Sequence, residues 1–316
     1  MPDWKQLEPA PTRRIKGRFD ELSKIRKYRE SVPDWLDELG EKALGEDLWT
    51  KELAALNLQA EVVLRANTLK TTKDNLRKAL LAENIESDPI KGYPTALKLR
   101  ERGNVFTTEA FKNGFFEVQD ASSQLVAPFL EVSPGQLVID TCAGAGGKTL
   151  HLAALMENKG QLIAMDIYAN KLHELKRRAK RDGAFNIEPR AIDTTKVIKK
   201  LHGRADRVLI DAPCSGLGVL RRNPDAKWKL QPDFLDKLKI TQQQILRDYS
   251  KMVKPGGKMV YATCSILPQE NNIQLKKFLS AEEGKDFTLA KEKKIYTSKT
   301  GYDGFYMALL EKKSTT

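Results

Sequence analysis

The feature that most constrains the fold of this chain is a regular alternation of apolar runs and helical segments across its second half. Helical spacing of apolar residues follows the first two runs, beginning at Lys148 and Ala169, and a longer helix is expected from Asp233 to Met252. The apolar runs, each bounded by turn residues, are residues 136–140, 161–166, 207–211 and 258–262. Such alternation predicts an α/β fold, in which a parallel sheet is flanked by helices.

The first third of the chain has a different pattern and predicts smaller units. A helical pattern with a basic stretch from Arg13 comes first, and a small α/β module follows it. The elements expected in this module are a strand near Glu61–Thr68, a helix at Thr72–Asn84 and a strand at Thr95–Leu99. With a boundary near Gly114, the expected domains are residues 1–56, 57–113 and 114–316.

The charge of the chain indicates the kind of partner that it binds. Of the 316 residues, 54 are Lys or Arg and 42 are Asp or Glu, a formal net charge of +12. An excess of cations favours a phosphate-rich partner such as nucleic acid, although a basic surface without any partner explains the charge equally well. No run of 18 apolar residues and no signal peptide is present, so we expect a cytoplasmic protein without a membrane contact, and by default a monomer.

The three cysteines, Cys142, Cys214 and Cys264, are spaced unlike those of a metal or disulfide framework. No CxxC pair occurs, and the three histidines lie far apart in the sequence. A zinc site is therefore not expected, and no metal is assigned. Lone cysteines are most often small buried apolar residues, so a catalytic role has to be argued from the local context.

A glycine-rich turn at residues 142–148 joins a buried strand to a helix, where a ligand can approach the backbone closely. A phosphate-binding P-loop is excluded, because its first glycine would fall at Cys142. Asp166 ends the next strand, where a carboxylate commonly accepts hydrogen bonds from ribose hydroxyls, and Asp193 follows a third strand. This set suits an adenosine ligand, while a nicotinamide cofactor stays open despite the missing GxGxxG pattern.

Two further strands each end in a short polar turn that carries a cysteine, Cys214 in one and Cys264 in the other. Ligands of open parallel sheets bind beyond the carboxyl ends of the strands, so both thiols should face one crevice. Methylation of cytosine at carbon 5 needs a thiolate that adds to carbon 6, and a second group that removes the proton from carbon 5. Asp211 is placed to stabilise charge on the ring.

These segments resemble the NOL1/NOP2/Sun family of RNA 5-methylcytosine methyltransferases. The resemblance runs from about Leu64 to Leu310 and is strongest in DTCAGAGGKT, DAPCSGLG, RRNPDAKW, YATCSILPQEN and DGFYMALL. It implies a Rossmann-like, S-adenosylmethionine-dependent domain with a mostly parallel seven-stranded sheet, preceded by helices and an RNA-recognition-like module. It also implies that Cys264 is the nucleophile and that Cys214 assists product release.

By the same resemblance, a set of residues would contact S-adenosylmethionine. They are Cys142, Ala143, Gly144, Ala145, Gly146, Gly147, Lys148, Asp166, Asp193 and Asp211. The family usually has proline where Ala145 stands, which predicts a less rigid turn here with its glycines intact.

Candidate RNA contacts lie in two places. The resemblance puts Arg65 and Asn67 near the substrate side, and the loop after Cys214 carries Arg221, Arg222 and Lys227. Cations of this kind hold phosphates, and a cytosine within reach of two thiols must be unpaired or flipped out of its helix. We expect ribosomal RNA as the first candidate and transfer RNA as the second.

Two other interpretations of this chain stay open at the level of the sequence. One is a non-catalytic RNA-binding or ribosome assembly factor that keeps the fold, which the intact cysteines and glycine turn disfavour. The other is a methyltransferase of proteins or small molecules, in which the paired cysteines would have no chemical role.

Overall fold

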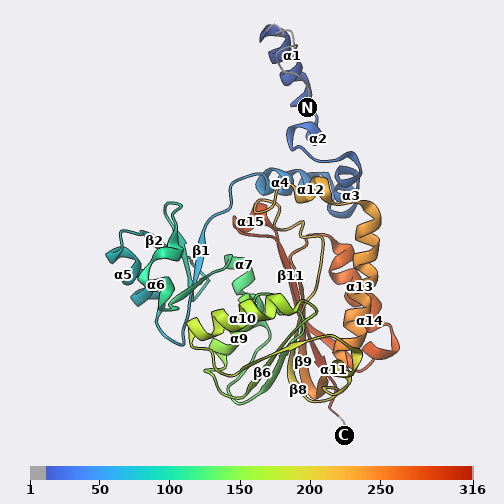
Figure 1. The fold of residues 1–316 in the computed structure, drawn as a ribbon. Helices are drawn as coiled ribbons and strands as arrows, with labels where there is room; N and C mark the ends of the chain where they lie inside the picture. Colours follow the sequence, from blue (N-terminus) through green and yellow to red (C-terminus); the bar gives the residue numbers. More distant parts are fainter. Residues whose placement is uncertain (1–11, 315–316) are drawn as a thin grey trace.

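A seven-stranded sheet forms the centre of the large domain in the computed structural model, which describes residues 12–314 (Figure 1). Its strands are β5 (Leu137–Asp140), β6 (Gln161–Asp166), β7 (Ile187–Ala191), β8 (Ala205–Asp211), β9 (Val253–Thr263), β10 (Phe287–Ile295) and β11 (Phe305–Lys312). Their order is β10-β11-β9-β8-β5-β6-β7. The five strands from β9 to β7 are parallel, and β11 is antiparallel to both of its neighbours. The predicted α/β class with a mostly parallel seven-stranded sheet is confirmed.

Helices cover both faces of this sheet. Strand residues such as Val138 and Leu209 pack on one face with α8, α9 and α10, and residues such as Ile139 and Val208 pack on the other with α11, α13 and α14. The helices of the large domain are α7 (Ala121–Gln124), α8 (Val126–Phe129), α9 (Gly147–Leu155), α10 (Ala169–Asp182), α11 (Thr195–Lys199), α12 (Ala226–Lys229), α13 (Pro232–Ser250), α14 (Asn272–Leu279) and α15 (Thr297–Thr300). Neighbouring strand residues point to opposite faces, so central strands such as β5 and β8 contribute to both cores.

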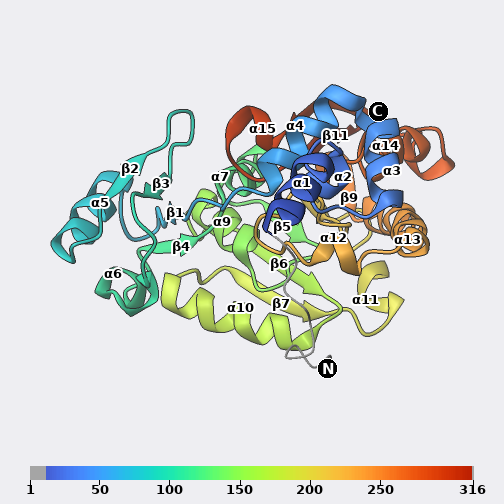
Figure 2. The ribbon, with the colours of Figure 1, turned by 90° about the horizontal axis from the view of Figure 1, so that it is seen from above.

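A four-stranded antiparallel sheet forms the small domain, which lies beside the large sheet in both ribbon views (Figures 1 and 2). Its strands, in spatial order, are β2 (Ser87–Pro89), β3 (Ala96–Leu99), β1 (Val63–Ala66) and β4 (Phe116–Val118). Two helices, α5 (Lys73–Ala82) and α6 (Glu109–Lys112), accompany it, and Leu76 and Leu80 of α5 share a core with the sheet. Strand β4 lies beyond Gly114, so the small sheet extends past the expected boundary.

Among the described residues, four helices precede the small domain, in the segment where the sequence pattern predicts helices: α1 (Thr12–Leu22), α2 (Arg26–Arg29), α3 (Asp34–Leu44) and α4 (Glu46–Leu56). Helix α1 projects away from the body of the molecule (Figure 1). By contrast, Leu36 of α3 and Leu53 of α4 are buried with Leu217 and Leu267, which lie in the loops after β8 and β9. The second helix pair therefore supports the loops that carry Cys214 and Cys264.

Candidate active site

Two cysteine-bearing turns meet at the carboxyl edge of the large sheet. Strands β8 and β9 are parallel neighbours, with Asp211 paired to Ala262 at their ends. The turns that follow bring Cys214 Sγ and Cys264 Sγ to 3.4 Å, a separation at which either thiol can donate a hydrogen bond to the other. Both side chains keep some exposure to solvent. The expectation that the two thiols share one crevice agrees with this geometry.

Glycines allow the two turns to approach each other so closely. The backbone N–H of Gly218 donates to the Cys264 carbonyl at 2.9 Å, and Gly304 N–H donates to the Gly218 carbonyl at 2.8 Å. A Cβ on Gly218 would lie 2.2 Å from the Gly304 oxygen and 2.8 Å from the Cys264 oxygen. Any larger residue would push the turn away from Cys264.

A lysine and a carboxylate adjoin the thiols. Lys148, in the first turn of α9, donates from Nζ to Asp211 Oδ2 at 2.6 Å. Burial alone would lower the pKa of Lys148, but the attraction of Asp211 outweighs it, and the pKa is raised with a smaller contribution from Cys264. Lys148 is therefore a stable cation next to the thiol pair.

The buried acids and thiols of this edge are shifted towards their neutral forms. The hydrogen bond with Cys264 and burial raise the pKa of the Cys214 thiol well above its usual range. Burial also raises the pKa of Cys142 far above normal. The pKa of Asp140 rises to about 7 because the carboxyl is buried, although it accepts a 2.7 Å hydrogen bond from the Thr149 hydroxyl. Cys214 is thus a thiol, not a thiolate, at neutral pH.

The glycine turn and two acids fit an adenosine cofactor. Gly146 has a φ of +93°, and a Cβ there would meet Leu175 at 2.1 Å, while a Cβ on Gly144 would meet only open space. Asp166 is fixed by the N–H groups of Gly144 and Tyr168, both at 2.8 Å, and a carboxylate so placed keeps acceptor capacity for hydroxyl groups. Asp193 follows β7 and is exposed.

The departure from the family pattern at Ala145 has a visible counterpart. The Ala145 carbonyl accepts a 2.6 Å hydrogen bond from Arg178 of α10. Arg178 also pairs with Glu117 of β4 at 2.6 Å, so the turn is tied to the small domain. This bond constrains the turn at the position where the family usually has proline.

The predicted RNA contacts in the small domain lie inside the protein. Arg65 is 1% exposed, and its Nε and Nη1 have no hydrogen-bond partner within the described residues. Burial lowers its pKa to about 10. Asn67 donates to the carbonyls of Gly114 and Asp182, both at 2.8 Å, and so joins the two domains. An RNA contact by either residue stays a prediction and would require its side chain to move.

The cations of the loop after Cys214 are also engaged. Arg221 and Arg222 both pair with Asp303, at 3.1 and 2.5 Å, and Arg222 pairs with Asp120 at 2.8 Å. Lys227 is buried and donates to the Glu30 carbonyl at 3.0 Å. Of these three cations, only Arg222 has a side chain that is about one third exposed. The structure gives this loop a supporting role, and its contact with RNA stays a prediction.

Several residues at this edge escaped the reasoning from sequence. Ile167 and Tyr168 directly follow Asp166 and are 63% and 53% exposed, which is unusual for apolar side chains beside a buried strand end. Glu270 is buried between the two cysteine turns. The sequence held one signal for Glu270. It is an acidic residue six positions after Cys264, within Pro268–Asn271, where nothing in the sequence explains a solvent-exposed charge.

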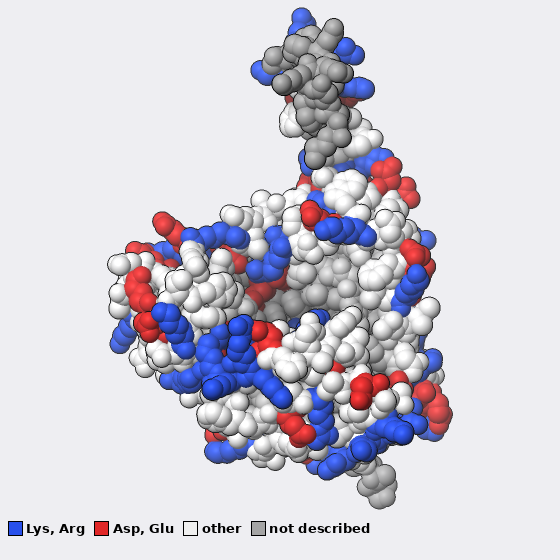
Figure 3. All heavy atoms as spheres, in the orientation of Figure 1, with Lys and Arg blue, Asp and Glu red and all other residues white. Residues whose placement is uncertain are grey.

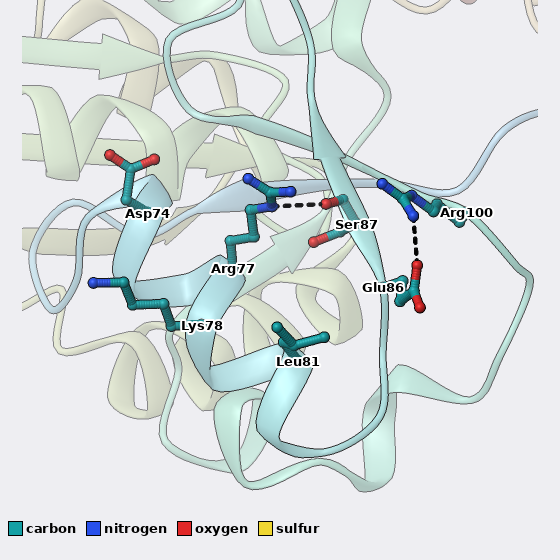
Figure 4. A pocket seen from close by; sticks show the side chains of 7 residues that line it. All are labelled: Asp74, Arg77, Lys78, Leu81, Glu86, Ser87 and Arg100. Atoms are coloured by element: carbon teal, nitrogen blue, oxygen red, sulfur yellow. Dashed lines mark hydrogen bonds and ion pairs between the residues drawn. The ribbon is translucent and has the colours of Figure 1, made fainter.

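A cavity of about 680 Å³ lies on the small domain, between α5 and β2 (Figure 4). Two of the cations that line it have local partners: Arg77 donates to the Ser87 carbonyl, and Arg100 pairs with Glu86. Within residues 12–314, no cluster of three or more His, Cys, Asp or Glu side chains could hold a metal ion, and no helix is long and apolar enough to cross a membrane.

The fold and the site together define a methyltransferase of the Rossmann-like, S-adenosylmethionine-dependent class. A family model described as 16S rRNA methyltransferase RsmB/F matches residues 127–311, more than half of the chain. A second, described as the ferredoxin-like domain of RsmF/B-like methyltransferases, matches residues 32–106. The chain therefore belongs to the RsmB/F RNA methyltransferases of the NOL1/NOP2/Sun family, and the resemblance seen in its motifs is confirmed.

Individual relatives agree with this assignment. The chain is 37% identical over 255 residues to a probable ribosomal RNA small subunit methyltransferase B of Synechocystis, covering 80% of this chain and 57% of that protein. It is 33% identical over 299 residues to the Bacillus subtilis protein of the same description, covering 90% and 67%. The chain thus spans between about half and two thirds of the length of these relatives.

A solved structure shares the fold. NSun6 from Pyrococcus horikoshii, determined with SFG, an analogue of S-adenosylmethionine, superposes with a TM-score of 0.82 at 21% identity. The match covers 90% of this chain and all of that one.

Proposed function

We propose that this protein transfers a methyl group from S-adenosylmethionine to carbon 5 of a cytosine in RNA, through a covalent adduct with Cys264. The observation that carries the proposal is the 3.4 Å separation of Cys264 Sγ and Cys214 Sγ at the carboxyl edge of a methyltransferase sheet. Core packing alone gives no reason to place two partly exposed thiols side by side beyond the ends of neighbouring strands. Addition to a pyrimidine ring requires one thiolate, and the elimination step requires a second group near carbon 5, so a second thiol beside the first is suited to assist it.

The reaction divides between the two cysteines. The Cys264 thiolate forms a bond to carbon 6, and the electron pair of the 5,6 double bond makes carbon 5 nucleophilic. When bound, S-adenosylmethionine supplies the electrophilic methyl group. A general base then takes the proton from carbon 5, the electron pair of the broken C–H bond returns to the ring, and the bond from Cys264 Sγ to carbon 6 breaks. We assign the assistance of this release to Cys214.

Electrostatics supports this division of roles. The hydrogen bond with Cys264 and burial raise the pKa of the Cys214 thiol well above normal, which disfavours Cys214 as the attacking thiolate. Lys148, a stable cation, lies near Cys264. Asp211, held at 2.6 Å by Lys148, is the polar group that would orient the ring and stabilise charge on it.

The proposed substrate is structured RNA, with ribosomal RNA first and transfer RNA second. The names of the relatives refer to ribosomal RNA of the small subunit. The charge of +12 suits a polyanion, and Lys and Arg side chains gather beside the small domain at the rim of a hollow in the surface (Figure 3). The target cytosine must leave its stack to reach the thiols.

Three proteins test the proposal: wild type, Cys264→Ala and Cys214→Ala, each incubated with radiolabelled S-adenosylmethionine and unmodified ribosomal or transfer RNA. Methyl transfer and denaturant-stable protein–RNA adducts are both measured. We expect Cys264→Ala to lose transfer and adduct together, by on the order of 10⁴-fold or more for a missing nucleophile. Cys214→Ala should accumulate the adduct, because its release is impaired.

The same experiment addresses the alternative of a non-catalytic RNA-binding or assembly factor. In that case, the wild type would bind RNA but transfer no methyl group to free RNA or to assembling small-subunit particles. Adduct formation by Cys264→Ala that equals that of the wild type would contradict the assignment of the nucleophile.

A further inference from the structure

A buried glutamate lies between the two cysteine turns. Glu270, at the end of a 3-10 turn (Pro268–Glu270) that follows β9, is 1% exposed. Its Oε1 accepts a 2.8 Å hydrogen bond from the backbone N–H of Ser215, and its Oε2 accepts 2.5 Å hydrogen bonds from the hydroxyls of Ser215 and Ser265. Ser215 and Ser265 are the residues directly after Cys214 and Cys264. One carboxylate therefore binds both turns one residue beyond the thiols.

The carboxylate is satisfied without a cation. Its fourth donor is Gln242 of α13, whose amide nitrogen is 3.1 Å from Glu270 Oε1 and 3.0 Å from the Pro213 carbonyl. No Lys or Arg forms an ion pair with it among the described residues. A buried charge compensated only by neutral donors is costly, so the arrangement needs a reason other than stability.

The surrounding bonds make this unit rigid. Tyr261 donates from its hydroxyl to the Glu270 carbonyl at 2.7 Å, and the Asn271 amide donates to the Ser265 carbonyl at 2.8 Å. The hydroxyls of Ser215 and Ser265 are 3.2 Å apart and form a compact ring of three groups with the carboxylate, to which each hydroxyl donates its single proton. Such a ring fixes the separation of the two turns, whereas apolar packing would leave them free to slide.

We propose that Glu270 is the positioning residue that sets the distance between the two thiols. It acts through Ser215 and Ser265 and does not touch the substrate, and this role rests on the two-thiol reaction proposed above. With the separation of the turns fixed, Cys214 stays within reach of the base that Cys264 would attack.

The test replaces Glu270 with glutamine, which has the same shape but only one acceptor oxygen. Its amide nitrogen cannot accept a hydrogen bond, so it would either face the Ser215 N–H, which is also a donor, or force the two hydroxyls to become acceptors. The matched control is Glu282→Gln, an exposed glutamate that pairs only with Lys285 among the residues that the structure describes. Thermal unfolding first confirms that each variant is folded.

The first readout needs neither RNA nor cofactor. Diamide takes two electrons and two protons from Cys214 and Cys264 and becomes the hydrazine, while the thiols become a disulfide. The rate of its formation depends on both the ionisation and the proximity of the thiols, so the limiting rate at high pH is compared, which reports their proximity. We expect Glu270→Gln to form this disulfide several-fold more slowly than the wild type and Glu282→Gln to match the wild type. In methyl transfer, kcat should fall about 10²-fold, as for an ångström-scale misplacement, with KM for RNA unchanged.

The outcomes separate this inference from the proposed function. A folded Glu270→Gln protein with the wild-type disulfide rate and the wild-type kcat overturns the positioning role. Should that variant fail to fold, Ser265→Ala, which removes one arm of the ring, decides by the same two readouts. If no protein methylates any RNA, the proposed function fails, while the disulfide rate still tests whether Glu270 sets the separation of the thiols.

Discussion

The carboxyl edge of the large sheet and the junction with the small domain both bury charged groups, but the partners of these groups differ between the two regions. At the junction, acids and arginines pair: Glu117 of β4 binds Arg178 and Arg181 of α10, and Asp303 binds Arg221 and Arg222, the second of which also reaches the Glu61 carbonyl. The buried Arg65 still has two nitrogens without a hydrogen-bond partner among the described residues. At the sheet edge, groups keep spare capacity, because Asp140 has one oxygen without a partner among the described residues and the Cys214 thiol faces another thiol. Ion pairs stabilise the contact between the domains, whereas acids and thiols that lack such partners remain available to take part in a reaction.

The junction should show the largest effect on stability. Asp303→Ala removes the carboxylate that is 3.1 Å from the buried Arg221 and leaves it only Asp120, at 3.9 Å. Removal of one member of a buried pair costs about 3–5 kcal/mol in the free energy of unfolding. Urea unfolding measures the loss, with the exposed Asp225→Ala as control. A loss below about 1 kcal/mol would mean that the junction is not held by these pairs.

The sheet edge should instead show its largest effect in catalysis. Lys148→Met removes the cation beside Asp211 and Cys264, and we expect kcat for methyl transfer to fall about 10²–10³-fold, as for loss of a preorganised charge. Adduct formation with RNA should slow in parallel. Lys159→Met, at an exposed position, is the control. An unchanged rate of adduct formation would show that Lys148 does not influence the nucleophile.

Asp140 allows a pH test of the same contrast. Burial raises its pKa in the folded protein from 3.8 to about 7, so between these values the folded state holds a proton that the unfolded state has lost. The free energy of unfolding therefore falls as the pH rises through this window, and the loss is complete above about pH 7. Asp140→Asn removes this cost. Relative to the wild type, it should gain up to about 3 kcal/mol between about pH 5 and pH 8, at about 1.4 kcal/mol per pKa unit.

Urea unfolding at both pH values measures this difference. The other carboxyl with a pKa of about 7, Asp182, is present in both proteins and cancels. An equal difference between the two proteins at both pH values would show that Asp140 does not titrate in this range.

The smallest effect is expected in the cavity under α5. Arg100→Ala removes exposed ion pairs with Glu86 and Asp88, so the melting temperature and methyl transfer should both stay within experimental error. A clear loss of transfer would show that this cavity contributes to the reaction, and would extend the active region beyond the sheet edge.

The alternation of strands and helices predicted the large sheet well, because its strands are buried and continuous. Strand β10 escaped this reasoning since seven of its nine residues are exposed, as befits the edge of a sheet. The residues 254–257 looked like a break before a strand, yet they lie inside β9, where the register with β8 is irregular. Short strands such as β2 and β4 carry too few residues for a pattern.

The candidate site was predicted unevenly for a physical reason. Motif residues such as Cys214, Cys264 and Lys148 lie at strand ends or in the first turn of a helix, and parallel topology alone brings such positions together. The residue type of a cation does not determine whether its side chain points to solvent or into the protein. Arg221 and Lys227 point inward because acids and carbonyls from distant segments bind them. The role proposed for Glu270 likewise depends on its hydrogen bonds to a turn 55 residues earlier in the chain, which the local sequence does not reveal.

The helices that support the cysteine turns are synthesised long before those turns, and this order has a consequence for folding. Lys227 binds the carbonyl of Glu30, 197 residues earlier, and Thr297 donates its N–H to Glu52 across 245 residues. As the chain leaves the ribosome from its N-terminus, α3 and α4 are made long before the segments that cover them. Their apolar faces must wait until nearly the whole chain has emerged, so the enzyme matures in one late step and a truncated product would lack an assembled active site.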